Sequence, residues 1–231
     1  MSNALDGIAA VVFDAVGTLV YPQPAAAAVY AQVGRRHGSR HTIEQIGTRF
    51  AAAFQHEELS DRQESFRTSE ARERLRWQRI VSQVLDDVSN PEACFQELFD
   101  HFSRPDAWRA NEDVVTLESL AARGLVIAIA SNYDRRLHAV VAGMPALRPV
   151  SHLIISSEVG WRKPASQFFA AVSQRCQVPP GQIAFIGDDL VNDYQAAEAA
   201  GMRAVLLSND CKAADQERLQ IGRLSELLPV N

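Results

Sequence analysis

Five short apolar runs constrain the fold of this 231-residue chain more than any other feature. Each run is rich in β-branched residues, is continuous rather than alternating in hydrophobicity, and ends in small or polar residues. Such runs are typical of parallel strands that helices cover on both faces. They read IAAVVFDA (8–15), LVIAIASN (125–132), HLIISSE (152–158), IAFIGDD (183–189) and RAVLLS (203–208).

Helical stretches such as SQFFAAVSQRC (166–176) and YQAAEAAGM (194–202) separate the last four runs. Strands alternating with helices predict right-handed crossovers and a doubly wound, Rossmann-like parallel α/β sheet. Ligands of such sheets bind at the carboxyl ends of the strands. We therefore expect the polar residues that end the runs to meet in space, namely Asp14, Ser131, Asn132, Asp188 and Asp189.

Residues 22–107 interrupt this rhythm, because they contain no strand-like run and their apolar residues recur with helical period. Asn90-Pro91-Glu92 is a typical helix start, with a capping side chain followed by proline in the first turn. We expect a four-helix insertion that lies over the carboxyl ends of the strands as a lid. The predicted domains are residues 1–21 with 108–231, and 22–107.

The composition of the chain indicates which kinds of binding partner are expected. A net charge of −5 provides no general field for nucleic acid or an anionic membrane, which favours a small ligand held by local charge. No apolar run reaches the roughly 18 residues of a membrane span, and the first residues show no signal-peptide pattern, so we expect a cytoplasmic protein. Cys94, Cys176 and Cys211 are widely spaced and predict neither a disulfide nor a zinc site. The sequence does not indicate an oligomeric state.

Four motifs follow one another at the predicted strand ends. They are Asp14 with Gly17-Thr18, then Ser131-Asn132, then Lys163-Pro164, and finally GDDLVND (187–193). In this order they resemble the four motifs of the haloacid dehalogenase superfamily. SNYDRRL (131–137), SEVGWRKPASQFF (157–169) and IGDDLVNDYQAAEAAGM (186–202) are similar to the branch named for a rhythmically expressed gene. The helical insertion resembles the superfamily's α-helical cap of the first type.

The resemblance implies a hydrolase, and we expect a phosphatase that acts on a small phosphorylated molecule through an aspartyl-phosphate at Asp14. A carboxylate attacks phosphorus only when the repulsion between two anions is removed, so Mg²⁺ is expected beside Asp14. Lys163 would neutralise the nucleophile and the phosphoryl group. The Ser131 hydroxyl and the Asn132 backbone N–H would donate to the phosphoryl oxygens, and Thr18 is a further candidate for substrate binding.

The candidate metal ligands are Asp14, Asp188 and, by family analogy, the backbone carbonyl of Val16. Asp193 is expected to orient the site as an acid near the metal, and the role of Asp189 is left open between ligand and loop residue. Each residue also has a plain structural alternative, since a carboxylate can cap a turn or a helix N-terminus and a lysine can be a solvated surface charge.

Val16 departs from the pattern of the family's phosphatases, which carry a general acid/base aspartate two residues after the nucleophile. Such assistance is typically worth about 10² to 10⁴ in rate. The chain is therefore expected to be a weak or selective phosphatase, or a silent relative that binds a phosphate ligand or a protein. A 2-haloacid dehalogenase is less favoured, since those enzymes lack the acidic fourth motif. Phosphonatase chemistry needs a cap lysine, and residues 22–107 contain none.

A few further residues are weaker candidates. Asp134 could replace the missing acid if its side chain reaches the site. Arg162 is expected to be a surface charge rather than a residue that shapes substrate entry. Tyr30, Arg35 and Arg36 are possible substrate contacts by position alone.

Overall fold

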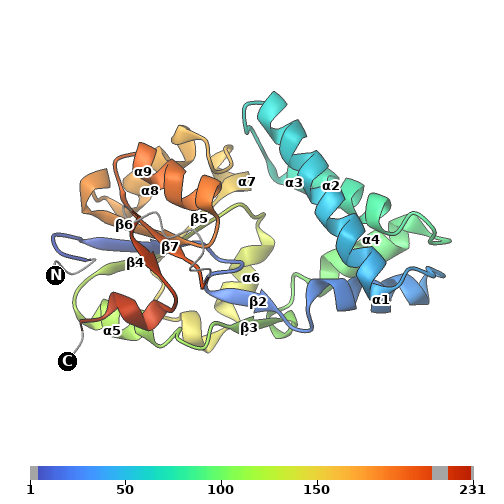
Figure 1. Cartoon of the computed structure of the whole chain (residues 1–231), viewed down its shortest axis with the longest axis horizontal. Coiled ribbons are helices and arrows are strands. Elements are labelled where there is room, and N and C mark those ends of the chain that lie inside the picture. The colour runs from blue at the N-terminus through green and yellow to red at the C-terminus, as the bar shows by residue number, and fades with distance from the viewer. Residues whose placement is uncertain (1–4, 210–217, 230–231) are drawn as a thin grey trace.

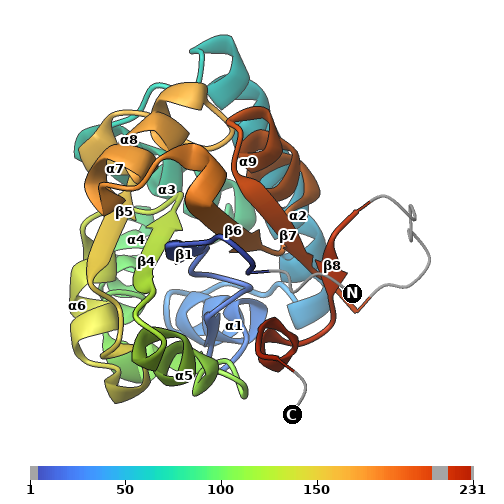
Figure 2. The same cartoon turned by 90° about the vertical axis from the view of Figure 1, so that its left-hand side faces the viewer.

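The computed structural model of the chain describes residues 5–209 and 218–229. Its main sheet has six parallel strands in the order β5-β4-β1-β6-β7-β8, seen side by side in Figure 2. The five predicted strands are all present. The strands are β1 (Ala10–Phe13), β4 (Val126–Ser131), β5 (His152–Ile155), β6 (Ile183–Gly187), β7 (Arg203–Leu207) and β8 (Gln220–Ile221).

Alternate side chains of the central strand β1 enter two different cores. Val11 and Phe13 lie in the core under α5 (Thr116–Ala122) and α6 (Arg136–Ala142). Ala10 and Val12 lie in the core under α8 (Ser166–Cys176) and α9 (Ala196–Ala199). Both faces of the strand are fully buried, which explains why its sequence is continuously apolar. The predicted doubly wound α/β fold is confirmed.

Four helices lie to one side of the sheet in Figure 1. They are α1 (Ala26–Arg36), α2 (Ile43–Gln63), α3 (Glu70–Val84) and α4 (Pro91–His101). Their buried side chains form a hydrophobic cluster of their own. The predicted start of α4 is confirmed, since the Asn90 side chain accepts from the Ala93 N–H at 3.1 Å and Pro91 is in the first turn. Assignment of residues 22–107 to a separate cap domain stays a prediction.

The sequence patterns missed three short strands, which are β8 at the edge of the main sheet and the pair β2 and β3. Strands β2 (Val20–Pro22) and β3 (Trp108–Ala110) pair antiparallel and lead from the sheet to the four helices (Figure 1). Three residues are too few to show a period. Helix α7 (Ser156–Val159) takes the second half of the run expected as strand 152–158, since the chain leaves the sheet directly after Ile155.

The described part of the chain contains two of the three cysteines. Cys94 and Cys176 are buried free thiols, and burial raises the pKa of each to about 11. Cys211 lies outside the described residues. Within residues 5–209 and 218–229, no helix combines the length and the apolar character that a membrane span requires.

Candidate active site

Asp14 lies where the order of the sheet reverses, directly after the central strand β1. Phe13 pairs with Ile129 of β4 on one side and with Ile186 of β6 on the other. The Asp14 N–H donates to the Ile186 carbonyl at 2.8 Å, which fixes the backbone at the strand end. Ser131 ends the neighbouring strand and is buried. The crevice beside such a switch point is where open α/β sheets bind their ligands.

Lys163 joins two carboxylates in a buried ion pair network. Its Nζ lies 2.6 Å from Asp14 Oδ1 and 2.6 Å from Asp193 Oδ1, and all three side chains are buried. Burial alone would lower the pKa of Lys163, but the charges of Asp14 and Asp193 and their hydrogen bonds raise it above the ordinary value. The ammonium is therefore held in its charged form.

Three carboxylates gather around this lysine. Asp14, Asp188 and Asp193 each offer an oxygen within 4.8 Å of the other two. Burial, followed by the charge of Asp14, raises the pKa of Asp188. Burial also raises the pKa of Asp193, to about 7, with a further contribution from Asp14 that Lys163 opposes. Three carboxylates facing one ammonium leave excess negative charge on hard oxygen donors, and this donor set fits a divalent cation such as Mg²⁺.

Two glycines make this close approach possible. Gly17 has φ +96°, and a Cβ there would lie 2.3 Å from Asp188 Oδ2. A Cβ on Gly187 would lie 2.1 Å from Asp193 Oδ2. Thr18 is fully buried and its hydroxyl donates to Asp188 Oδ1 at 3.1 Å. The structure thus gives Thr18 a carboxylate partner, and its role in substrate binding stays a prediction.

Asp189 and Asp193, the two acids that follow Asp188, have different partners in the structure. Asp193 accepts from Lys163 with one oxygen and from the Asp189 N–H with the other, at 3.1 Å. The Asp189 carboxylate instead accepts from the Val191 and Asn192 N–H groups at 2.8 and 2.9 Å, where it caps the helical turn Leu190–Gln195. Asp193 faces the cluster, whereas Asp189 is engaged by the start of the next helix.

Asn132 connects the second and third motifs. Its side chain accepts from the Lys163 N–H at 2.7 Å and donates to the Lys163 carbonyl at 3.0 Å. This pair of hydrogen bonds holds the backbone that carries the lysine. Asn132 and Lys163 also line a cavity of about 480 Å³ together with Asp189 and Phe66, through which a ligand can approach.

The structure shows no free acid at the general acid position occupied by Val16 or at its suggested replacement, Asp134. The Val16 side chain is 36% exposed and lines a second cavity, where it has no ionisable group. Asp134 is buried in a two-point ion pair with Arg136, with Nε–Oδ1 and NH2–Oδ2 distances of 2.7 Å. The hypothesis that Asp134 replaces the missing acid is wrong, because its carboxylate is already committed to a guanidinium.

Arg162 is not the surface charge that the sequence suggested. It is buried and pairs with Asp61 of α2 at 3.3 Å (Nε to Oδ2) and with Glu73 of α3. Arg76 shares Asp61 at 3.1 Å. These contacts tie the loop that carries Lys163 to the four helices. The acids lie about 90 to 100 positions away in sequence, so no local pattern identifies them.

Of the three weaker candidates in α1, only Tyr30 lies near the site. Tyr30 is buried and lines the same cavity as Val16. Arg36 pairs with Glu97 on α4, with Nε–Oε1 at 2.9 Å, and Arg35 is exposed in a hollow beside His41. Both arginines therefore lie away from the site around Asp14.

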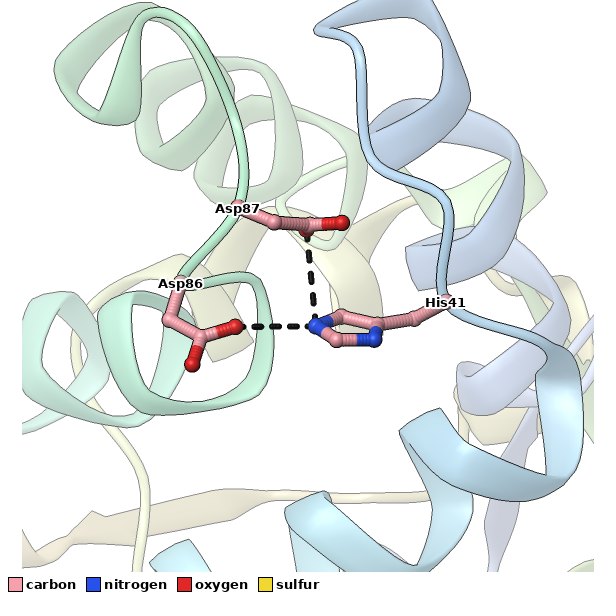
Figure 3. Close-up of side chains that lie close together, drawn as sticks. All are labelled: His41, Asp86 and Asp87. Atoms are coloured by element: carbon pink, nitrogen blue, oxygen red, sulfur yellow. Dashed lines mark hydrogen bonds and ion pairs between the residues drawn. The ribbon is translucent and has the colours of Figure 1, made fainter.

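A second group of possible metal ligands lies at the far end of the helices (Figure 3). His41 Nε2 is 2.8 Å from Asp86 Oδ1 and 3.5 Å from Asp87 Oδ1. Arg49 also pairs with Asp86 at 2.6 Å, and the Arg40 N–H donates to Asp87 at 2.8 Å. This exposed group already has cationic and backbone partners for both acids.

Two sequence relatives resemble different lengths of the chain. A mouse protein called haloacid dehalogenase-like hydrolase domain-containing protein 3 is 34% identical over 113 residues, which cover 48% of this chain and 45% of that protein. The match thus spans about half the length of this curated relative. A phosphoserine phosphatase from Thermus thermophilus is 24% identical over 233 residues, 91% of this chain and 94% of the relative.

The fold has solved counterparts. An L-2-haloacid dehalogenase matches with a TM-score of 0.75 over 95% of this chain and 97% of its own, at 18% identity, which is a likeness of fold. The model of the haloacid dehalogenase-like hydrolase family matches residues 8–201, a range that contains all four motifs. The chain is therefore a member of the haloacid dehalogenase-like hydrolases.

Proposed function

We propose that this hydrolase is a magnesium-dependent phosphatase that acts on a small phosphorylated molecule through an aspartyl-phosphate at Asp14. The observation that carries the proposal is the contact of Lys163 with both Asp14 and Asp193 beside the third carboxylate, Asp188. A buried nucleophile with a fixed cation and a hard-oxygen metal site is what phosphoryl transfer requires.

Asp14 acts as the nucleophile. One of its oxygens is bound by Lys163, so the other attacks phosphorus while the ester oxygen departs with its electron pair. Lys163 balances the negative charge of the carboxylate and the phosphoryl oxygens, and the Ser131 hydroxyl and Asn132 N–H donate to those oxygens. Water then attacks phosphorus, which releases phosphate and regenerates Asp14.

Asp14 and Asp188, with the Val16 carbonyl, are the proposed ligands of Mg²⁺. When bound, the ion would supply positive charge that offsets the repulsion between the attacking carboxylate and the phosphoryl group. Asp193 orients Lys163 and contributes charge to the same site. Thr18 positions Asp188 through its hydroxyl, and Asp189 shapes the loop by capping its helical turn.

Residues 22–107 act in this proposal as the cap, which selects the organic part of the substrate. The contacts of Arg162 with Asp61 and Glu73 support this assignment, since they hold α2 and α3 next to the loop of Lys163. Because Val16 cannot give a proton to the leaving group, the reaction favours substrates whose leaving group is stable as an anion.

The relatives bear on the choice of reaction. The Thermus relative that aligns over most of both chains is a phosphatase. The fold neighbour is a dehalogenase, and the feature that favours phosphatase here is the group of three carboxylates around Lys163, which provides a place for a cation. A site that only binds a ligand has no chemical need for a carboxylate nucleophile at Asp14.

The test is the time course of phosphate release from p-nitrophenyl phosphate and from acetyl phosphate, with Mg²⁺ or with excess EDTA. Both leaving groups are stable as anions, so neither requires the missing acid. We expect metal-dependent turnover of at least one compound, with a burst if water attack on the aspartyl-phosphate is slow. Rates equal to those of Asp14→Asn for both compounds would overturn the proposal and favour a silent binding protein.

A further inference from the structure

An apolar cavity of about 310 Å³ adjoins the place where the general acid is missing. Val16 and Asn132 form its side toward the site, two positions that lie next to Asp14 and to the Lys163 backbone. The Val16 side chain is one of the few large apolar groups of the described residues that are exposed, and this cavity is what it faces. The leaving group of a phosphate held at Asp14 and Lys163 can extend into this space.

Helices α1, α2 and α3 line the cavity with aromatic rings. Tyr30 meets Phe50 edge to face with centroids 5.4 Å apart, and Phe50 stacks on Phe54 at 6.0 Å. Phe54 in turn contacts Trp77 at 6.4 Å. All four rings line the cavity. Their mutual contacts fix the orientation of each ring, so they form a preformed wall rather than a set of mobile side chains.

Three further aromatic rings line the cavity, and one of them, Phe102, contacts Tyr30 with centroids 6.2 Å apart. Phe102 contacts Trp108 at 5.9 Å, and Trp108 contacts Tyr133 at 6.2 Å. The polar atoms of the last two rings are already used, because Trp108 Nε1 and the Tyr133 hydroxyl both donate to the Phe102 carbonyl, at 3.2 and 3.3 Å. What these residues offer to a ligand is therefore aromatic surface.

The charge of the lining residues excludes a second acidic group on the ligand. Arg136 is the only lysine, arginine or acid among the described residues that line the cavity. Its Nε and NH2 donate to Asp134, and its NH1 donates to the Phe99 carbonyl at 3.2 Å. Its guanidinium carbon also lies 3.7 Å from the centroid of the Phe99 ring. A ligand carboxylate or second phosphate would enter without a free cation to meet it.

From the missing acid and the aromatic walls together we infer the substrate class: phosphate monoesters of aromatic alcohols, in which the phosphate lies at Asp14 and the ring fills this cavity. The inference rests on the proposed function. When the Asp14 oxygen attacks phosphorus, the P–O bond to the ring breaks and the electron pair leaves as a phenolate, which the ring stabilises. The phenolate needs no proton from the protein, so Val16 is compatible with turnover of this class and not of alkyl esters.

The test compares ligands with and without a ring in the wild-type protein with Mg²⁺. We expect phenylphosphonate, which cannot be hydrolysed, to bind about 10- to 30-fold more tightly than methylphosphonate in calorimetry, the gain expected for burying one ring. We expect p-nitrophenyl phosphate to be turned over with a lower KM than acetyl phosphate. Equal affinity of the two phosphonates would overturn the inference.

A variant that fills the cavity gives the second measurement. Ala26 lines the cavity at the start of α1, and its neighbour Ala25 is exposed, so Ala26→Phe and Ala25→Phe form a matched pair. Ala26→Phe should raise KM for p-nitrophenyl phosphate about tenfold or more and leave acetyl phosphate unchanged, while Ala25→Phe changes neither. Turnover of acetyl phosphate but not of aryl phosphates would retain the proposed function and reject this inference. No Asp14-dependent turnover of either compound, together with equal binding of the two phosphonates, would reject both.

Discussion

The two groups of clustered carboxylates in this molecule have similar geometry and different charge balance. Each brings three side chains with possible ligand atoms within 4.8 Å of one another. Asp14 and Asp188 directly follow strands and Asp193 lies in the helical turn Leu190–Gln195; Lys163 pairs with Asp14 and Asp193, and these two acids are buried. Asp86 and Asp87 lie in the exposed turn after α3. His41 contacts both (Figure 3), and Arg49 pairs with Asp86.

This difference in charge between the two groups shows that proximity of ligand atoms does not by itself indicate a metal site. At the group of His41, Asp86 and Asp87, here called the helical group, there are only two acids, and each already has a partner: Arg49 pairs with Asp86 and the Arg40 N–H donates to Asp87. At Asp14, three acids face one lysine in a partly desolvated crevice, and the pKa values of Asp188 and Asp193 are raised by this environment. An excess of carboxylate oxygens over protein cations, from which a bound ion can displace protons, is the feature that favours a divalent cation.

The largest contrast is expected when one carboxylate of each group is neutralised. Asp14→Asn removes the nucleophile, so turnover of p-nitrophenyl phosphate should fall to the rate measured with EDTA. Asp86→Asn changes the same atoms in the other group and should retain the wild-type rate. Steady-state kinetics with equal amounts of folded protein, checked by circular dichroism, decide the comparison. Unchanged turnover in Asp14→Asn would remove this residue from the mechanism.

Restoring the missing acid is expected to have the next largest effect. Val16 is partly exposed in the cavity, so the side chain of Val16→Asp has room beside the leaving group. A general acid is worth about 10² to 10⁴ in rate, and we expect a gain approaching this range for alkyl phosphates and a smaller one for p-nitrophenyl phosphate. The measurement is kcat/KM for both kinds of ester.

Val16→Asn is the matched control for this gain, because it has nearly the same shape and no ionisable proton. An equal increase in Val16→Asn would assign the effect to polarity. If Val16→Asp folds and neither ester is turned over faster, the assumption that leaving-group protonation limits the wild-type protein is wrong.

Sequence patterns were sufficient to predict the alternating strands and helices of the main sheet. Continuous apolar runs predicted the five main strands, and the parallel order of a doubly wound sheet then brought Asp14, Ser131 and Asp188 to one edge. The polar residues that end the runs carried the motif order that the family model also matches. These features can be predicted from the sequence because each depends on only a few neighbouring residues.

The remaining features of the site depend on contacts between distant segments. Nothing near Arg162 indicates that Asp61 and Glu73, about 90 to 100 positions away, will cover it. Helical periodicity identified Phe50 and Phe54 as apolar positions of one face. It could not tell that these rings line a cavity next to Val16, because that depends on how α2 packs against the loop after β1.

Proton release should distinguish the two carboxylate groups when Mg²⁺ is added. In the metal-free protein burial raises the pKa of Asp193 from 3.8 to about 7, so this group keeps a proton that a bound cation would displace. Mg²⁺ affinity should therefore weaken by up to about tenfold per pH unit below 7. Calorimetry in two buffers of different ionisation enthalpy, between pH 5.5 and 8, measures the released proton.

The same raised pKa has a consequence for stability without metal. The folded protein binds more protons than the unfolded chain between about pH 4 and 7, so the contribution of Asp193 to the free energy of unfolding decreases as pH rises through this window. Asp193→Asn should flatten both the Mg²⁺ profile and this slope. A wild-type Mg²⁺ affinity that is independent of pH would contradict the proposed charge balance.

The smallest effect is expected at the helical group itself. The hydrogen bond from His41, followed by that from Arg49, lowers the pKa of Asp86, so this exposed ion pair contributes stability above the ordinary carboxylate pKa and loses it as pH falls further. His41→Ala should reduce the free energy of unfolding at pH 7 by no more than about 1 kcal/mol, the usual range for surface pairs. Denaturant unfolding at low and high salt measures this loss, which should be smaller at high salt.

Turnover and Mg²⁺ affinity of His41→Ala should stay at wild-type values, because the carboxylates that attract the cation are those of Asp14, Asp188 and Asp193. A weaker Mg²⁺ affinity in His41→Ala would make the helical group a second cation site and remove the distinction between the two.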